Sequence, residues 1–287
     1  MLWQQMMEFM KSWFVYPGLS WGLMLIAIGL GIAFGAIWLC AHWVPLKRYW
    51  LWAVAVAGAF LGLLAVTFLQ IPLQYYIGQA LQHFWSIDTL NAWLLLVAIP
   101  QILVSGLVQE GAKMVPMVAW WWRSGKKIDP KLGLAIGAVA GAGFGIFEAV
   151  WVHGSVLASG WTFDVINTYG FLGISPFWER FFTIGFHIAV SALAGYGLAK
   201  GKAWQYFLIA SGLHAIVNYA PIVLNYSMMV RNSNVITVTH VEIFLAVVAV
   251  AVTAVVMILR WRKGKEEVQI EPEELSVEPE MPAKIDV

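Results

Sequence analysis

Seven stretches of apolar residues, each long enough to cross a bilayer, constrain this chain more than any other feature of its sequence. A membrane-spanning helix needs roughly 20 predominantly apolar residues. Only 11% of the 287 residues are charged and 61% are hydrophobic, whereas a soluble domain carries about 25% charged residues. The sequence therefore predicts an all-α, polytopic transmembrane helix bundle, with spans at about 20–42, 50–70, 91–122, 132–157, 178–199, 204–225 and 240–261.

The two ends of the chain differ in composition from the transmembrane domain expected between them, 17–262. Residues 1–16 place apolar side chains at helical spacing around Glu8, which predicts an interfacial amphipathic helix or, alternatively, a frayed extension of the first span. Residues 263–287 hold eight of the sixteen acidic residues and too few apolar groups to fold, which predicts a disordered acidic tail. Between the second and third spans, 71–90 is expected to form a short surface or re-entrant helix.

Basic residues gather in every second connection between the spans. They are Lys47, Arg48, Arg123, Lys126, Lys127, Lys131, Lys200 and Lys202, and a further basic run, 260–265, follows the last span. Because connections rich in Lys and Arg stay on the cytoplasmic side, we expect an integral membrane protein, most simply of a prokaryotic cell membrane, with its N-terminus outside and its C-terminus in the cytoplasm. The net charge of +1 gives no sign of nucleic-acid binding, and the lipid bilayer is the expected surrounding.

Two acidic residues, Glu110 and Glu148, lie deep inside the expected spans, together with Lys113, His187 and His214. An ionisable side chain in a bilayer costs at least ~2.5–3.5 kcal/mol, so it is a functional candidate by default. At 1.5 Å per helical residue, Glu110 and His187 lie roughly 20 Å from the basic ends of their helices. His214 lies roughly 18 Å and Glu148 roughly 25 Å from the same side, so four helices are expected to bring titratable groups to one site.

The helical phase of these residues supports a shared site. Glycines recur every four residues across 133–145, which predicts close helix packing, and Glu148 falls near the centre line of this glycine stripe. His187 shares a helical face with Ser191, and His214 shares one with Asn218. We therefore expect these side chains to face neighbouring helices and not lipid.

Each of these residues also has a purely structural interpretation. Glu110 and Lys113 are three residues apart on one helix and can form a buried ion pair in cis. An intramembrane histidine can simply hydrogen-bond between helices, and Asn218 can join helices in the same way. Two glutamates, two histidines and one asparagine at a common depth together favour a functional site. A single cysteine, Cys40, excludes a Cys-based metal site.

Four short motifs lie in the third to sixth spans: Gln109-Glu110-Gly-Ala-Lys113, Gly143-Phe-Gly-Ile-Phe-Glu148, Glu179-Arg180 with His187, and His214-Ala-Ile-Val-Asn218. In this order they resemble the PrsW/YhfC group of intramembrane peptidases, which are related to the CAAX-processing and bacteriocin-processing (CPBP) membrane glutamic proteases. The resemblance covers about 105–220, within the expected core-site region 91–225. The first two spans and the last one match only by being hydrophobic.

The resemblance implies an endopeptidase that hydrolyses a peptide bond of a membrane-anchored or membrane-adjacent protein with a water activated by Glu and His. It places Glu110 and His187 at the water, and His214 and Asn218 at the developing oxyanion. Glu148 would be a second carboxylate that holds a histidine. The side chains expected to contact the substrate are Lys113, Arg180 and Ser191.

Gln109 departs from the family pattern, which begins with paired glutamates. A glutamine cannot act as a base, so either Glu110 or Glu148 takes over, or the chain is a non-catalytic relative that binds a peptide or lipid in the same cavity. A proton-coupled transporter is a third interpretation, since buried Glu and His also form proton relays. A metal-free mechanism is preferred, and the alternative is a zinc site of Glu148, His187 and His214 with an open fourth position.

Overall fold

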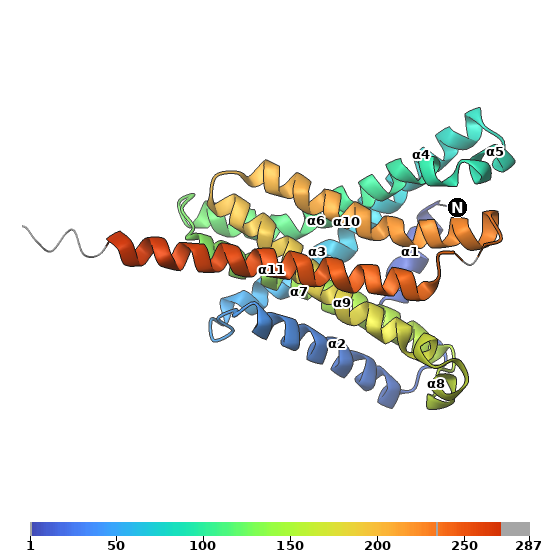
Figure 1. The fold of residues 1–287 in the computed structure, drawn as a ribbon, viewed down its shortest axis with the longest axis horizontal. Coiled ribbons are helices and arrows are strands. Elements are labelled where there is room, and N and C mark those ends of the chain that lie inside the picture. Colours follow the sequence, from blue (N-terminus) through green and yellow to red (C-terminus); the bar gives the residue numbers. More distant parts are fainter. Residues whose placement is uncertain (1, 234, 271–287) are drawn as a thin grey trace, which may run out of the picture.

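All regular structure in the described part of the chain is helical (Figure 1). The computed structural model describes residues 2–233 and 235–270, and their side chains up to residue 261. Seven helices are long and apolar enough to cross a membrane, which confirms the predicted all-α bundle of seven spans. They are α2 (Trp21–Ala41), the continuous helix Trp50–Phe84, α6 (Leu94–Arg123), α7 (Pro130–Ala158), α9 (Phe171–Ala199), α10 (Ala203–Asn225) with its extension η2 (Tyr226–Val230), and α11 (Val238–Ile270).

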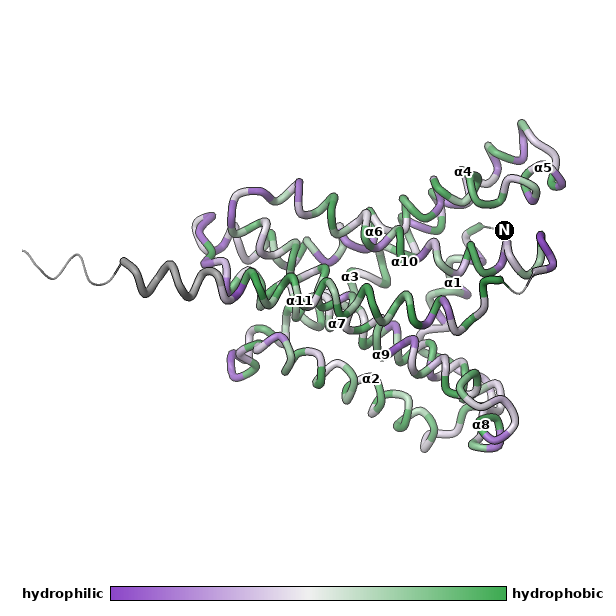
Figure 2. Tube along the Cα trace, viewed as in Figure 1, coloured by the Kyte–Doolittle hydropathy of each residue, from purple (hydrophilic) through white to green (hydrophobic). Residues whose placement is uncertain are grey.

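The basic connections lie together at one end of the bundle (Figure 1), which we call the basic end. It holds the connections 42–49, 124–129 and 200–202. The short helices lie at the opposite end, the short-helix end: α1 (Leu2–Ser12), α5 (Ile87–Ala92) and α8 (Phe163–Tyr169). Hydrophobic residues dominate the long helices between the two ends (Figure 2). Which side of a membrane each end faces stays a prediction.

The structure describes the two terminal segments, 1–16 and 263–287, only in part. The interfacial position predicted for 1–16 is not tested by the fold. α1 packs against α7 through Phe9, whose ring centroid lies 5.8 Å from that of Trp151, and Trp13, directly after α1, stacks on the same indole at 5.1 Å. α11 runs to Ile270, past residue 263, where the tail is expected to begin. The remainder of the predicted tail, 271–287, lies outside the described residues.

The second span continues beyond its predicted end at residue 70. α3 (Trp50–Ala65) passes through a π-helical turn, η1 (Val66–Gln70), directly into α4 (Ile71–Phe84). Pro72 lies in the first turn of α4 and has no N–H to donate, and the wider π turn accommodates it without ending the helix. Residues 71–84 therefore prolong the second span, where the sequence predicts a separate surface or re-entrant helix.

Two helices, α7 and α9, form the centre of the bundle. In their most apolar windows, 78% of α7 and 83% of α9 is buried, against 28–39% for the other five spans. A Cβ on Gly137 would lie 2.1 Å from the Ser191 carbonyl oxygen, and one on Gly141 would lie 2.2 Å from that of His187. Only glycine permits so close an approach, so the predicted packing role of the glycine stripe is confirmed.

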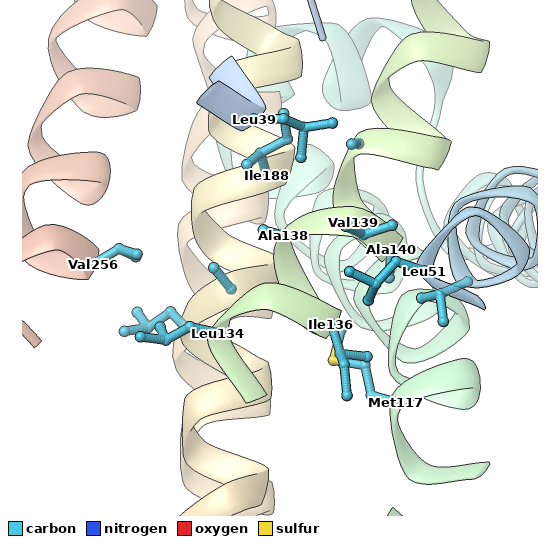
Figure 3. Close-up of a cluster of buried hydrophobic side chains, with 14 of the residues drawn as sticks. Leu39, Leu51, Met117, Leu134, Ile136, Ala138, Val139, Ala140, Ile188 and Val256 are labelled. Atoms are coloured by element: carbon cyan, nitrogen blue, oxygen red, sulfur yellow. The ribbon is translucent and has the colours of Figure 1, made fainter. Parts of the chain in front are cut away.

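Apolar side chains of α2, α3, α6, α9 and α11 pack around α7 and form a hydrophobic core (Figure 3). Ile136 and Leu134 of α7 are 1% and 3% exposed, and Met117 of α6 and Ile188 of α9 are equally buried. This core fixes the rotation of α7 and α9 about their axes. The same rotation turns His187 toward Lys113 of α6, and Glu148 toward Arg180 and His187 of α9.

Candidate functional site

Glu110 is the point at which α6, α9 and α10 meet. Its Oε1 lies 2.5 Å from Nζ of Lys113 and accepts a hydrogen bond from Nδ1 of His214 at 2.7 Å. Ser191 of α9 donates from its hydroxyl to Oε2 of Glu110 at 3.5 Å. Glu110 and Lys113 are 1% and 0% exposed. The predicted ion pair between Glu110 and Lys113 of the same helix is confirmed. Glu110 also contacts α9 and α10 through hydrogen bonds.

A second group of contacts continues from Lys113 toward the short-helix end. Nζ of Lys113 lies 3.1 Å from Nδ1 of His187, and Nε2 of His187 lies 3.2 Å from Oε2 of Glu148. Arg180 donates to the same Glu148 oxygen at 3.0 Å and also to the carboxylate of Glu179. The result is one continuous series of contacts, which we call the polar chain: His214, Glu110, Lys113, His187, Glu148, Arg180 and Glu179.

The partners of the two histidines assign their tautomers. A lysine ammonium has only donors, so Nδ1 of His187 accepts from Lys113 and its Nε2–H donates to Glu148. An ionised carboxylate only accepts, so Nδ1 of His214 carries the proton that it donates to Glu110. In a neutral ring, Nε2 of His214 is then the unprotonated nitrogen. The polar chain therefore ends in one free basic nitrogen.

A cavity of about 70 Å³ lies beside the polar chain, between α7, α9, α10 and α11. One buried water requires a cavity of about 10–15 Å³, so this cavity has room for water. Glu148, Arg180, His187, His214 and Asn218 are on its wall, next to apolar side chains of α10 and α11. A pocket lined by ionisable side chains and large enough for water, inside the apolar bundle, is the setting that hydrolytic or proton-transfer chemistry needs.

Four predicted site residues are not on the wall of this cavity: Gln109, Glu110, Lys113 and Ser191. Glu110, Lys113 and Ser191 are buried behind the two histidines. The structure thus brings together all four titratable groups expected at a common depth, but it separates Glu110, Lys113 and Ser191 from the cavity. Their predicted roles at a water or a substrate stay predictions. Helical phase predicts which way a side chain faces, but not which of two groups on the same face lies nearer to a cavity.

Gln109 belongs to a separate network of amides and hydroxyls. Its Nε2 donates to Oε1 of Gln70 at 3.0 Å and to Ser105 at 3.1 Å, and Asn218 donates to the same Ser105 at 2.9 Å. Neither of these hydrogen bonds of Gln109 is to a residue of the polar chain, although Glu110 is its neighbour in sequence. Gln109 therefore ties α6 to η1, and Asn218 connects this network to the cavity.

Glu242 and His153 are buried titratable residues that the sequence analysis does not include among the site candidates. Glu242 is 5% exposed one turn into α11, and its Oε2 has no hydrogen-bond partner. His153 is fully buried between the rings of Phe34 and Phe177, whose centroids lie 5.8 and 5.2 Å from that of its imidazole. Glu242 falls inside the predicted span 240–261, which is the signal that could have identified it.

The described residues include one group able to hold a metal ion: Glu110, His187 and His214, with candidate ligand atoms within 4.8 Å of one another. This oxygen-and-nitrogen donor set suits zinc. Glu148, the carboxylate predicted for the zinc site, is not in the group, and Arg180 and His187 already bind it. The Lys113 ammonium contacts both Glu110 and His187, so an ion bound between those two would have to displace it. Zinc stays a prediction.

No protein-family model, curated protein or solved structure matches this chain. The resemblance to PrsW/YhfC and CPBP proteases therefore depends on the four sequence motifs alone. The fold itself defines a class, a helical integral membrane protein with seven spans. Within that class, the distinguishing feature is a buried chain of Glu, Lys, His and Arg side chains next to a small cavity.

Proposed function

We propose that this protein is an intramembrane endopeptidase in which His214 is the general base. The observation that carries the proposal is the 2.7 Å contact between Glu110 and His214, a carboxylate and an imidazole that are 1% and 2% exposed. A carboxylate that accepts from one ring nitrogen holds the ring in the tautomer whose other nitrogen takes a proton. His214 is also on the cavity wall, where a water can be bound.

The proposed reaction begins with a water in the cavity attacking the carbonyl carbon of a peptide bond. Nε2 of His214 takes the proton of that water, and the Glu110 carboxylate stabilises the resulting imidazolium. Arg180 is a hydrogen-bond donor on the cavity wall and would stabilise the oxyanion. The tetrahedral intermediate then expels the amine, which receives the proton from His214. Glu110 therefore acts through His214. His187, in turn, is positioned by its contacts with Lys113 and Glu148.

The substrate, the metal content and the membrane orientation in this proposal are those expected from the sequence. The substrate is a membrane-anchored or membrane-adjacent protein, the enzyme needs no metal, and the basic end faces the cytoplasm. On that orientation, the cavity lies in the half of the bilayer nearer the outside. The zinc alternative predicts a different result, since metal analysis of the purified protein would then find about one zinc ion per chain.

The test is hydrolysis in liposomes that contain the purified protein and a detergent extract of cell membranes. We expect new peptide termini in mass spectra, and their rate of formation should fall at least ~10²-fold in His214→Gln and in Glu110→Gln. Asp164→Asn, a carboxylate change in α8 away from the polar chain, serves as the control and should leave the rate unchanged. Undiminished hydrolysis in His214→Gln would rule out this residue as the base.

The sequence-based alternatives make different predictions in the same liposomes. A non-catalytic relative would gain hydrolysis only on Gln109→Glu. Proton-coupled transport is favoured by one observation, the continuity of the polar chain from His214 to Glu179 across several helices. Proton flux reported by a pH-sensitive dye, in the absence of new peptide termini, would replace the peptidase proposal with that function.

A further inference from the structure

The cavity is separated from the surroundings of the bundle by a thin apolar wall between α10 and α11. An apolar groove of about 300 Å³ lies between the same two helices. Ala220 of α10 and Val241 and Phe244 of α11 border both the cavity and the groove. Phe244 is 36% exposed, so its ring reaches the outer surface of the bundle. A molecule lying in this groove is therefore one side chain away from the polar chain.

The contact between α10 and α11 is held by apolar packing alone in the part of the chain with described side chains. No hydrogen bond or ion pair is found between these two helices there. On the opposite side of the cavity, by contrast, Glu148 of α7 is bound to both Arg180 and His187 of α9. Apolar side chains can change rotamer without leaving a polar group unpaired, so this wall is the one that can open at least cost.

A break in the hydrogen bonding of α10 lies at the same place. Pro221 has no backbone N–H, so the carbonyl of Val217 cannot take its usual helical hydrogen bond. Both residues are on the cavity wall. The cavity wall therefore carries a carbonyl at Val217 that Pro221 cannot pair, and a donor at Nε of Arg180, which is buried without a hydrogen-bond partner.

We infer that a membrane-embedded peptide segment reaches the site sideways from the lipid, between α10 and α11. The inference rests on the proposed function and names its substrate class, a protein segment inside the bilayer. The groove takes apolar side chains, and Val217 and Arg180 take the backbone groups of the segment where its own helix unwinds. A peptide backbone in hydrocarbon must find such partners, whereas an acyl chain has no group to pair with them.

Photocrosslinking tests the inference without requiring hydrolysis. A benzoylphenylalanine replaces Phe244 in one Glu110→Gln protein and Phe60 in another. Phe60 is a matched control on α3, 49% exposed and remote from the groove. The probe is a biotinylated peptide with one span of about 20 leucine and alanine residues and a central Gly-Gly, in phosphatidylcholine liposomes. We expect at least a fivefold higher yield of peptide adduct at Phe244 than at Phe60.

A second variant closes the mouth. Ala220→Trp in the Phe244 crosslinking protein should reduce the adduct to the level of Phe60, because the indole would fill the shared wall. Equal yields at Phe244 and Phe60 would mean that the groove holds only lipid, and this would overturn the inference. Adduct at Phe244 without hydrolysis by the wild-type protein would keep the docking site and reject the peptidase. Hydrolysis of this peptide with equal adduct yields would keep the peptidase and reject this route.

Discussion

At the scale of single residues, the site is ordered by which groups can donate and which can accept. Lys113 donates hydrogen bonds to both Glu110 and His187, and the bond to Nδ1 of His187 leaves the Nε2–H of that ring to donate to Glu148. The sequence predicts that these residues meet, because an isolated charge in the bilayer is too costly. It does not predict their order, which depends on rotamers of side chains from different helices. The position of Lys113 between a carboxylate and an imidazole is therefore learned only from the structure.

Removing the buried cation should destabilise the protein more than removing the pair. Lys113→Met leaves the Glu110 charge without its ammonium partner, and we expect a loss of about 3–5 kcal/mol in the free energy of unfolding. Unfolding in mixed micelles at increasing dodecyl sulfate measures it. The double variant Lys113→Met with Glu110→Gln should recover most of that loss, since no unpaired charge remains. Equal destabilisation of the single and double variants would contradict a charge-based origin.

At the scale of elements, the site depends on the close approach of α7 and α9. The glycine stripe lets the α7 backbone lie against the carbonyl oxygens of Ser191 and His187. The four-residue glycine period can be recognised in the sequence, but the helix that packs against it cannot. The structure shows that this helix is α9. The π turn before α4 could not be recognised, because its cause, the accommodation of Pro72, leaves no periodic signal.

A methyl group in this contact should separate the two helices. Gly137→Ala places a Cβ 2.1 Å from a backbone oxygen of Ser191, and overpacking of this kind costs about 1–3 kcal/mol. Thermal unfolding followed by size-exclusion chromatography should show a lower midpoint. Gly29→Ala in α2, which has no atom within 4 Å of its Cβ position, is the control and should be neutral or slightly stabilising. An equal effect of both changes would show that helix propensity, and not close packing, governs the result.

At the scale of the whole molecule, seven apolar helices surround one polar chain. The number of spans and the shared depth of Glu110, Glu148, His187 and His214 follow from hydropathy and from the rise per residue. The side from which the cavity opens cannot be predicted from hydropathy or from the rise per residue. It depends on packing between α10 and α11, which are both hydrophobic in sequence. Glu242 illustrates the same limit, since its burial at the cavity end is produced by the packing of α11 against α9.

A double-mutant cycle between α6 and α10 measures most directly whether titratable groups from separate helices meet. The four proteins are the wild type, Glu110→Gln, His214→Phe and the double variant, each unfolded in mixed micelles. With the two side chains 2.7 Å apart and buried, we expect a coupling free energy of about 1–3 kcal/mol. Effects that add within about 0.3–0.5 kcal/mol would mean that Glu110 and His214 do not touch, and the proposed site would not exist.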